Sequence, residues 1–101
     1  MKNFNDIMSK KTTEIKAIIG ELPNEFDSHY FIQKFAQKFQ REYIEMLNLY
    51  IDNGVPFQTV NQQISSFLAK NEDNFGIKGQ GKISSQNIFG NNSECERWLK
   101  N

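Results

Sequence analysis

The expected architecture rests on residues 26–56, FDSHYFIQKFAQKFQREYIEMLNLYIDNGVP. Large apolar residues recur there at intervals of three and four, which is typical of one face of an α-helix. Asp27 suits the N-cap, where its carboxylate can accept a backbone amide of the first turn. Gly54 suits the left-handed residue that ends a helix, and Pro56 prevents continuation. The pattern predicts a helix over 27–53, about 38 Å long, as the central element.

Two further helices are expected, one on each side of this segment. An apolar spacing with one polar gap at Lys11 predicts a helix over 5–21, which should stop before Pro23. Pro56 is well placed as the first residue of a third helix over 56–70, whose apolar stripe is regular. We expect both helices to pack against the central one.

The last third of the chain changes character, because glycines gather there and the apolar periodicity disappears. We interpret 71–92 as an irregular glycine-rich segment. A small hairpin turning at Gly79–Gly81 is an alternative, although isolated two-stranded ribbons are only marginally stable. The sequence Ser93-Glu94-Cys95-Glu96 has the pattern of a capping box, which predicts a short terminal helix over 94–100. The whole pattern predicts an all-α fold, a helical bundle that forms a single domain over 1–101.

Composition limits the classes of function. Twelve basic and twelve acidic residues cancel, and neither sign forms a stripe, which disfavours binding to nucleic acid through phosphate neutralisation. One cysteine excludes an internal disulfide framework and any multi-cysteine zinc site within one chain. No segment approaches the roughly 20 apolar residues that span a bilayer, and the start lacks the apolar core of a signal peptide. We expect no membrane association and a cytoplasmic location.

The single histidine and the single cysteine both have structural explanations. His29 follows Asp27 and Ser28, but consecutive residues cannot converge as a catalytic triad does, and the aspartate and serine suit helix capping. Cys95 has no second cysteine to resolve an oxidised form, so we interpret it as a packing thiol. A pocket that held His29 or Cys95 beside a carboxylate would change this interpretation.

Two further patterns resemble functional motifs without meeting their requirements. Glu42 and Glu45 each follow a cation by four residues, which is typical of ion pairs on a helix surface. Segment 76–82 has the glycine spacing and the lysine of a phosphate-binding loop, but Ile83 replaces the required Ser or Thr. We therefore predict no enzymatic activity, no catalytic residue, no cofactor and no metal ligand.

The unusual feature is the outer face of the predicted third helix, which carries no charge before Lys70. Its side chains are amides and hydroxyls: Gln58, Thr59, Asn61, Gln62, Gln63, Ser65 and Ser66. Such groups can be buried against a partner without desolvating a charge. We predict a small non-catalytic module that binds another protein or a second copy of itself. The alternative explanation is compositional, since the whole chain is rich in asparagine.

A second functional hypothesis is a DNA-associated regulatory protein. Residues 45–70 would form a helix-turn-helix, the glycine- and lysine-containing segment after it would act as a wing, and the amide side chains would read adenine edges. The neutral charge and the length of the preceding helix argue against this hypothesis, so nucleic acid ranks below protein as the expected partner.

Overall fold

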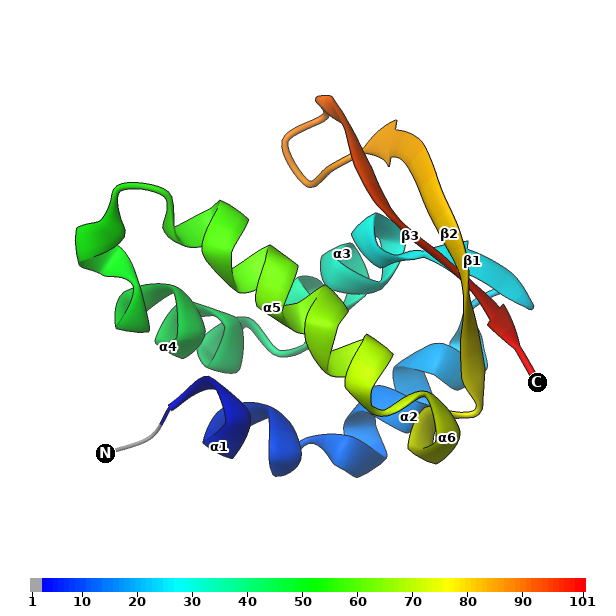
Figure 1. Ribbon diagram of the computed structural model, residues 1–101. Coiled ribbons are helices and arrows are strands. Elements are labelled where there is room, and N and C mark those ends of the chain that lie inside the picture. The colour runs from blue at the N-terminus through cyan, green and yellow to red at the C-terminus, as the bar shows by residue number, and fades with distance from the viewer. Residues whose placement is uncertain (1–2) are drawn as a thin grey trace.

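The computed structural model describes residues 3–101 and contains a three-stranded antiparallel sheet as well as helices (Figure 1). The elements follow one another as α1 (Phe4–Ser9), α2 (Thr12–Glu21), β1 (Glu25–Asp27), α3 (Ser28–Lys38), α4 (Gln40–Leu49), the 3₁₀ helix η1 (Ile51–Asn53), α5 (Pro56–Lys70), α6 (Glu72–Phe75), β2 (Ile77–Gln86) and β3 (Asn92–Lys100). The strand order is β1-β3-β2, so the last strand of the chain is the central strand of the sheet. In Figure 1 the β2–β3 hairpin extends beyond α3.

The prediction of an all-α helical bundle is wrong, because the segment predicted as a terminal helix forms β3. Cys95 and Trp98 are both buried and lie three residues apart, a spacing that also occurs on one face of a helix. In the structure the register of β2 against β3 shifts between Gly79 and Lys82, beside this pair. Such an irregularity re-aims side chains of a strand, and both buried side chains reach the first turn of α3.

A hairpin does form in the glycine-rich region, but not where the alternative prediction placed it. Gly79–Gly81 lies within β2, opposite β3, rather than at a turn. The turn is made by Asn87, whose Oδ1 accepts the amides of Phe89 and Asn91 at 2.9 and 3.1 Å. Pairing of β1 with β3 adds a third strand, which stabilises the ribbon. The interpretation of 71–92 as irregular is therefore wrong, since α6 and β2 occupy most of it.

The prediction of one continuous central helix over 27–53 is also wrong. Its first residue belongs to β1, and the remainder is divided into α3, α4 and η1, with a break at Phe39 (φ −126°, ψ 59°). A straight helix of the predicted length, about 38 Å, would be longer than the molecule, whose longest dimension is 36 Å. The break allows α4 to pack against α1 and α5.

The sequence predicts the ends and caps of the helices better than it predicts their lengths. The predicted helix over 5–21 forms two helices, α1 and α2, which separate at the polar gap around Lys11. The capping role of Asp27 is confirmed, because its Oδ1 accepts the amide of Tyr30 at 2.8 Å. The third helix is confirmed with the predicted bounds, Pro56–Lys70.

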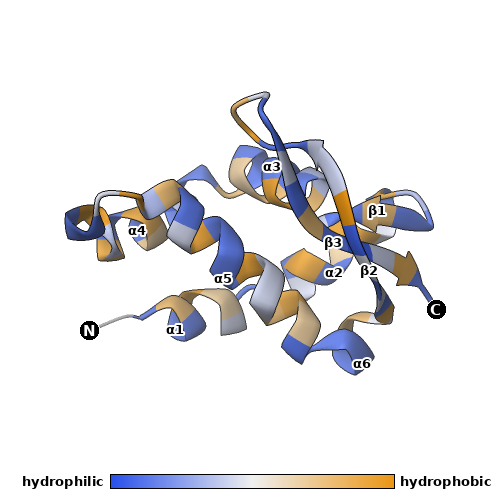
Figure 2. Ribbon diagram, turned by 45° about the horizontal axis from the view of Figure 1, so that its top comes forward, coloured by the Kyte–Doolittle hydropathy of each residue, from blue (hydrophilic) through white to orange (hydrophobic). Residues whose placement is uncertain are grey.

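One hydrophobic cluster joins the helices to the sheet. Its fully buried members include Met8 of α1, Phe35 of α3, Met46 of α4 and Trp98 of β3. Polar and apolar residues alternate along α5 (Figure 2), so this helix presents one face to the cluster and the opposite face outward. Within residues 3–101, no helix has both the length and the apolar character that crossing a membrane requires.

Candidate functional site

A groove of about 710 Å³ lies between α5 and the β2–β3 hairpin, and it reaches the start of α3. The α5 wall of the groove is formed by Gln58, Asn61, Gln62, Ser65 and Ser66, which are five of the seven side chains predicted as an interaction face. The other two lie elsewhere. Thr59 accepts a hydrogen bond from the side-chain amide of Asn53 at 2.9 Å, and Gln63 is half-buried outside the groove lining.

Ser28 fixes the inner end of the groove. Its hydroxyl accepts the indole N–H of Trp98 at 2.9 Å and lies 2.7 Å from the hydroxyl of Ser65. Because the indole nitrogen can only donate, the Ser28 proton remains available for Ser65. This chain of hydrogen bonds connects β3, α3 and α5, so the two walls of the groove are held at a defined separation.

Tyr43 orients the middle of the α5 wall. Its hydroxyl donates to Oδ1 of Asn61 at 2.6 Å. Burial raises the pKa of Tyr43 to about 12. The Asn61 oxygen is therefore occupied from within the protein, whereas Gln58, Gln62 and Ser66 are exposed to solvent.

Two aromatic rings meet at the hairpin turn, where Phe89 lines the groove and Phe57 packs against it. Phe57, at the start of α5, and Phe89, in the hairpin turn, lie edge to face with their centroids 5.1 Å apart. Their exposed fractions are 39% and 59%, which is high for phenylalanine. An exposed aromatic pair beside a concave surface is typical of a recognition site.

The charged residues in the groove lining are Lys82 and Glu94, one of each sign. Lys82 is also 3.9 Å from the carboxylate of Glu96, at a largely exposed position. The groove consequently has no strong electrostatic preference, which matches the neutral composition of the whole chain.

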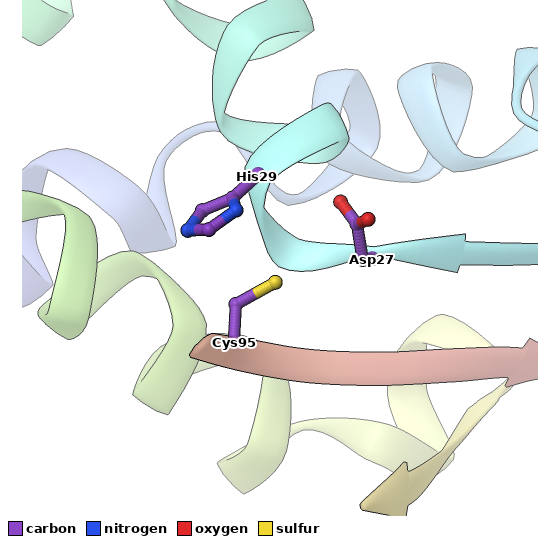
Figure 3. A group of neighbouring side chains, drawn as sticks. All are labelled: Asp27, His29 and Cys95. Atoms are coloured by element: carbon purple, nitrogen blue, oxygen red, sulfur yellow. The ribbon is translucent and has the colours of Figure 1, made fainter. Parts of the chain in front are cut away.

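The groove also brings together the three residues that the sequence analysis had assigned separate structural roles. Asp27 ends β1, His29 lies in the first turn of α3, and Cys95 lies on β3. One ligand atom of each residue lies within 4.8 Å of those of the other two. Figure 3 shows the histidine and aspartate side chains on the same side of β3 as the cysteine sulfur.

Two serines contact the imidazole of His29. Ser85 Oγ lies 2.7 Å from Nδ1 and 3.6 Å from the sulfur of Cys95, so it stands between the ring and the thiol. Ser93 Oγ lies 3.2 Å from Nε2. Burial lowers the pKa of His29, and the charge of Asp27 partly offsets this effect. A neutral imidazole is therefore the favoured form near neutral pH, and it can act as an acceptor or a metal ligand.

Sequence reasoning missed this cluster because it assigned Cys95 to a helix. Pairing of Asp27 with Arg97 across β1 and β3 brings the cysteine region beside the start of α3. Segment 76–82, which resembles a phosphate-binding loop in spacing, is mostly part of β2 and therefore does not form such a loop. The expected ion pair between Lys38 and Glu42 is replaced by two others, because Glu42 contacts Lys11 at 3.6 Å and Lys38 contacts Glu21.

Comparison with known proteins found no matching family model, no matching curated protein and no matching solved structure.

Proposed function

We propose that this chain is a non-catalytic module whose groove binds an extended segment of a partner protein. The observation that carries the proposal is the chemistry of the groove. Its α5 wall is built from amides and hydroxyls, and the exposed Phe89 in its lining packs against the exposed Phe57. The volume of about 710 Å³ lies within the range of natural ligand sites.

The amide side chains suit the backbone of a peptide. Gln58 and Gln62 each offer donors and an acceptor, which an extended segment requires along its length. Because both side chains are neutral, a partner can bury them without removing a charge from water. Phe57 and Phe89 would supply the apolar anchor, since aromatic side chains dominate the binding energy of many interfaces.

The proposal can be tested with peptides displayed on phage. A library of random dodecapeptides would be selected on the immobilised full chain, and the enriched peptides would be measured in solution by fluorescence polarisation. We expect Phe89→Ala to weaken binding at least about thirtyfold, which corresponds to the threshold of about 2 kcal/mol for an interface hot spot. We expect Gln62→Glu to weaken it as well, because it places a charge in the neutral groove.

Matched substitutions outside the groove serve as controls. Gln63→Glu introduces the same charge on the same helix. Ile44→Ala removes an apolar side chain of α4 that is 62% exposed. Both controls should bind as the unchanged chain does. Equal binding by Phe89→Ala and Ile44→Ala would place the peptide elsewhere and would contradict the proposal.

A second copy of the chain is the other protein partner to consider. Sedimentation at high micromolar concentration would detect a dimer, and loss of that dimer in Phe89→Ala would assign the groove to self-association. A monomer at that concentration would leave a different protein as the partner.

One observation favours DNA as a second candidate. The β2–β3 hairpin stands beside the outer face of α5, as a wing would stand beside a recognition helix, and the amides of that face suit adenine edges. The charge of the groove argues against DNA, because Lys82 is the cation in the groove lining and the carboxylate of Glu96 lies beside it. Binding to random duplex at low salt tests this candidate, because phosphate contacts are strongest there. A dissociation constant above one millimolar would exclude it.

A further inference from the structure

Three donor side chains of different chemistry converge beside the groove, and they come from three different elements. Asp27 offers a carboxylate oxygen, His29 a ring nitrogen and Cys95 a sulfur. Since all three atoms lie within 4.8 Å of one another, they share a point no more than about 2.8 Å from each. We propose that Asp27, His29 and Cys95 bind one divalent transition-metal ion of the zinc class.

The donor set indicates which ions the site would select. Sulfur and imidazole ligands suit Zn²⁺ and its spectroscopic substitute Co²⁺, whereas Mg²⁺ and Ca²⁺ require oxygen ligands. Zinc is held at about 2.0–2.3 Å from such atoms, so each donor needs to approach by less than about 1 Å. Side-chain rotation supplies movements of that size, and the thiol proton is released to solvent when the sulfur ligates.

The backbone holds the three donors in place without a metal. Asp27 is paired with Arg97 across the sheet, two residues from Cys95, and His29 follows Asp27 at the start of α3. One oxygen of Asp27 accepts the amide of Tyr30, which fixes the orientation of the carboxylate and leaves its other oxygen for the ion. The site is therefore built on a strand pair and a helix start rather than on a loop, which favours precise ligand geometry.

Hydrogen bonds around the histidine identify its ligating nitrogen. Ser85 contacts both Nδ1 of His29 and the sulfur of Cys95, so Nδ1 is the nitrogen that shares a neighbour with the thiol. A metal bound there would replace these two contacts of Ser85. Ser93 contacts Nε2, where an outer partner of a metal-bound imidazole usually lies.

Three protein ligands leave a fourth position of the tetrahedron for another molecule. His29 and Cys95 both line the groove, so this position faces the groove. The inference does not depend on the proposed peptide binding, because none of the three ligands belongs to the α5 wall or to the aromatic pair.

Titration of the tag-free full chain with Co²⁺ tests the proposal. We expect one equivalent to produce a sulfur-to-cobalt charge-transfer band in the near ultraviolet and visible bands of tetrahedral cobalt, and an equivalent of Zn²⁺ to abolish both. Cys95→Ser should remove the charge-transfer band. His29→Gln and Asp27→Asn should weaken affinity by more than about tenfold, since even outer partners of metal ligands contribute about that much.

The Asp27→Asn variant is designed to keep the fold, because asparagine caps helices as well as aspartate does. Asp52→Asn is its matched control, since Asp52 is an exposed residue of η1. Circular dichroism establishes that each variant is folded before titration. Equal cobalt affinity in Asp27→Asn and Asp52→Asn, or a cobalt spectrum without a thiolate band in the unchanged chain, would overturn the proposal.

Discussion

Ser28 is a small residue at the point where three elements meet. It is 1% exposed, it accepts the indole N–H of Trp98, and it lies beside the hydroxyl of Ser65. Burial of a polar group is unfavourable unless the group is hydrogen-bonded. Here each polar atom of the trio has a partner, so the arrangement both stabilises the fold and sets the inner end of the groove.

Replacing Ser28 with alanine should destabilise the protein by about 1–3 kcal/mol, because the buried indole N–H of Trp98 loses its acceptor. Urea unfolding followed by the fluorescence of the single tryptophan measures this loss. Ser66→Ala, an exposed position on the same groove, is the control and should change stability by less than about 0.5 kcal/mol. A Ser28→Ala variant as stable as this control would contradict the role assigned to Ser28.

Tyr43 predicts a pH dependence of stability in alkaline solution. Burial raises its pKa to about 12 in the folded chain, above the usual value of roughly 10. Between these values the unfolded chain has lost the phenolic proton while the folded chain keeps it, so stability falls as pH rises. The contribution of Tyr43 to the free energy of unfolding is fully present below a pH of about 10 and is lost as the pH passes about 12.

The unfolding free energies of the unchanged chain and of Tyr43→Phe, measured between pH 9 and pH 11.5 by urea titration, isolate this effect. We expect the variant to lack part of the decline, because phenylalanine has no proton to lose. Tyr30→Phe, at a 40% exposed position, should retain the full decline. Parallel pH profiles for the unchanged chain and Tyr43→Phe would refute the assignment.

At the scale of elements, the sequence predicted the boundaries of helices better than their continuity. Pro56 fixed the start of α5, and Asp27 fixed the start of α3, because caps and prolines act within one turn. The break at Phe39 has no such local signal: the apolar spacing continues through it. The break allows α4 to contact α1 and α5, and the periodicity of one segment carries no information about such distant contacts.

The strands were missed for a related reason. Ser93 and Glu96 match a capping box, but β3 acquires its stability from partners that are distant in sequence, Glu25–Asp27 and Ile77–Gln86. Strand preference depends strongly on such neighbours. Five side chains of the predicted interaction face do line the groove, whereas the cluster of Asp27, His29 and Cys95 required the strand pairing to be known.

The end of η1 offers an element-scale prediction about glycine. Gly54 has φ of 84°, and Gly20 lies within α2, yet a Cβ atom would meet no neighbour within 4 Å at either position. The two sites therefore differ in backbone conformation rather than in space. We expect Gly54→Ala to cost about 1–2 kcal/mol and Gly20→Ala to stabilise by about 0.5–1 kcal/mol. Thermal unfolding checks both, and effects of the same sign would be inconsistent with the left-handed turn.

At the scale of the whole molecule, β3 joins the segment before α3 to the C-terminal hairpin. β3 lies between β1 and β2, and it carries the buried side chains Cys95 and Trp98. Beyond the ladder, the Lys100 amide donates to Asn24 at 2.8 Å, and its ammonium donates to the carbonyl of Leu22 at 2.6 Å. Because these contacts join residues far apart in sequence, we expect the helices to depend on β3 for a defined packing.

A chain truncated after Gln86 tests this dependence. In an all-α fold the deletion would remove a terminal helix of about two turns, and the other helices would still unfold cooperatively. In the observed fold it removes the central strand, leaves β1 and β2 without a partner and opens the core where Trp98 was buried. We expect the truncated chain to lose its cooperative thermal transition, measured by circular dichroism, and a synthetic peptide of residues 87–101 to restore it when added in excess. Cooperative unfolding of the truncated chain without the peptide would show that the helices form a stable core by themselves, and the central role of β3 would have to be abandoned.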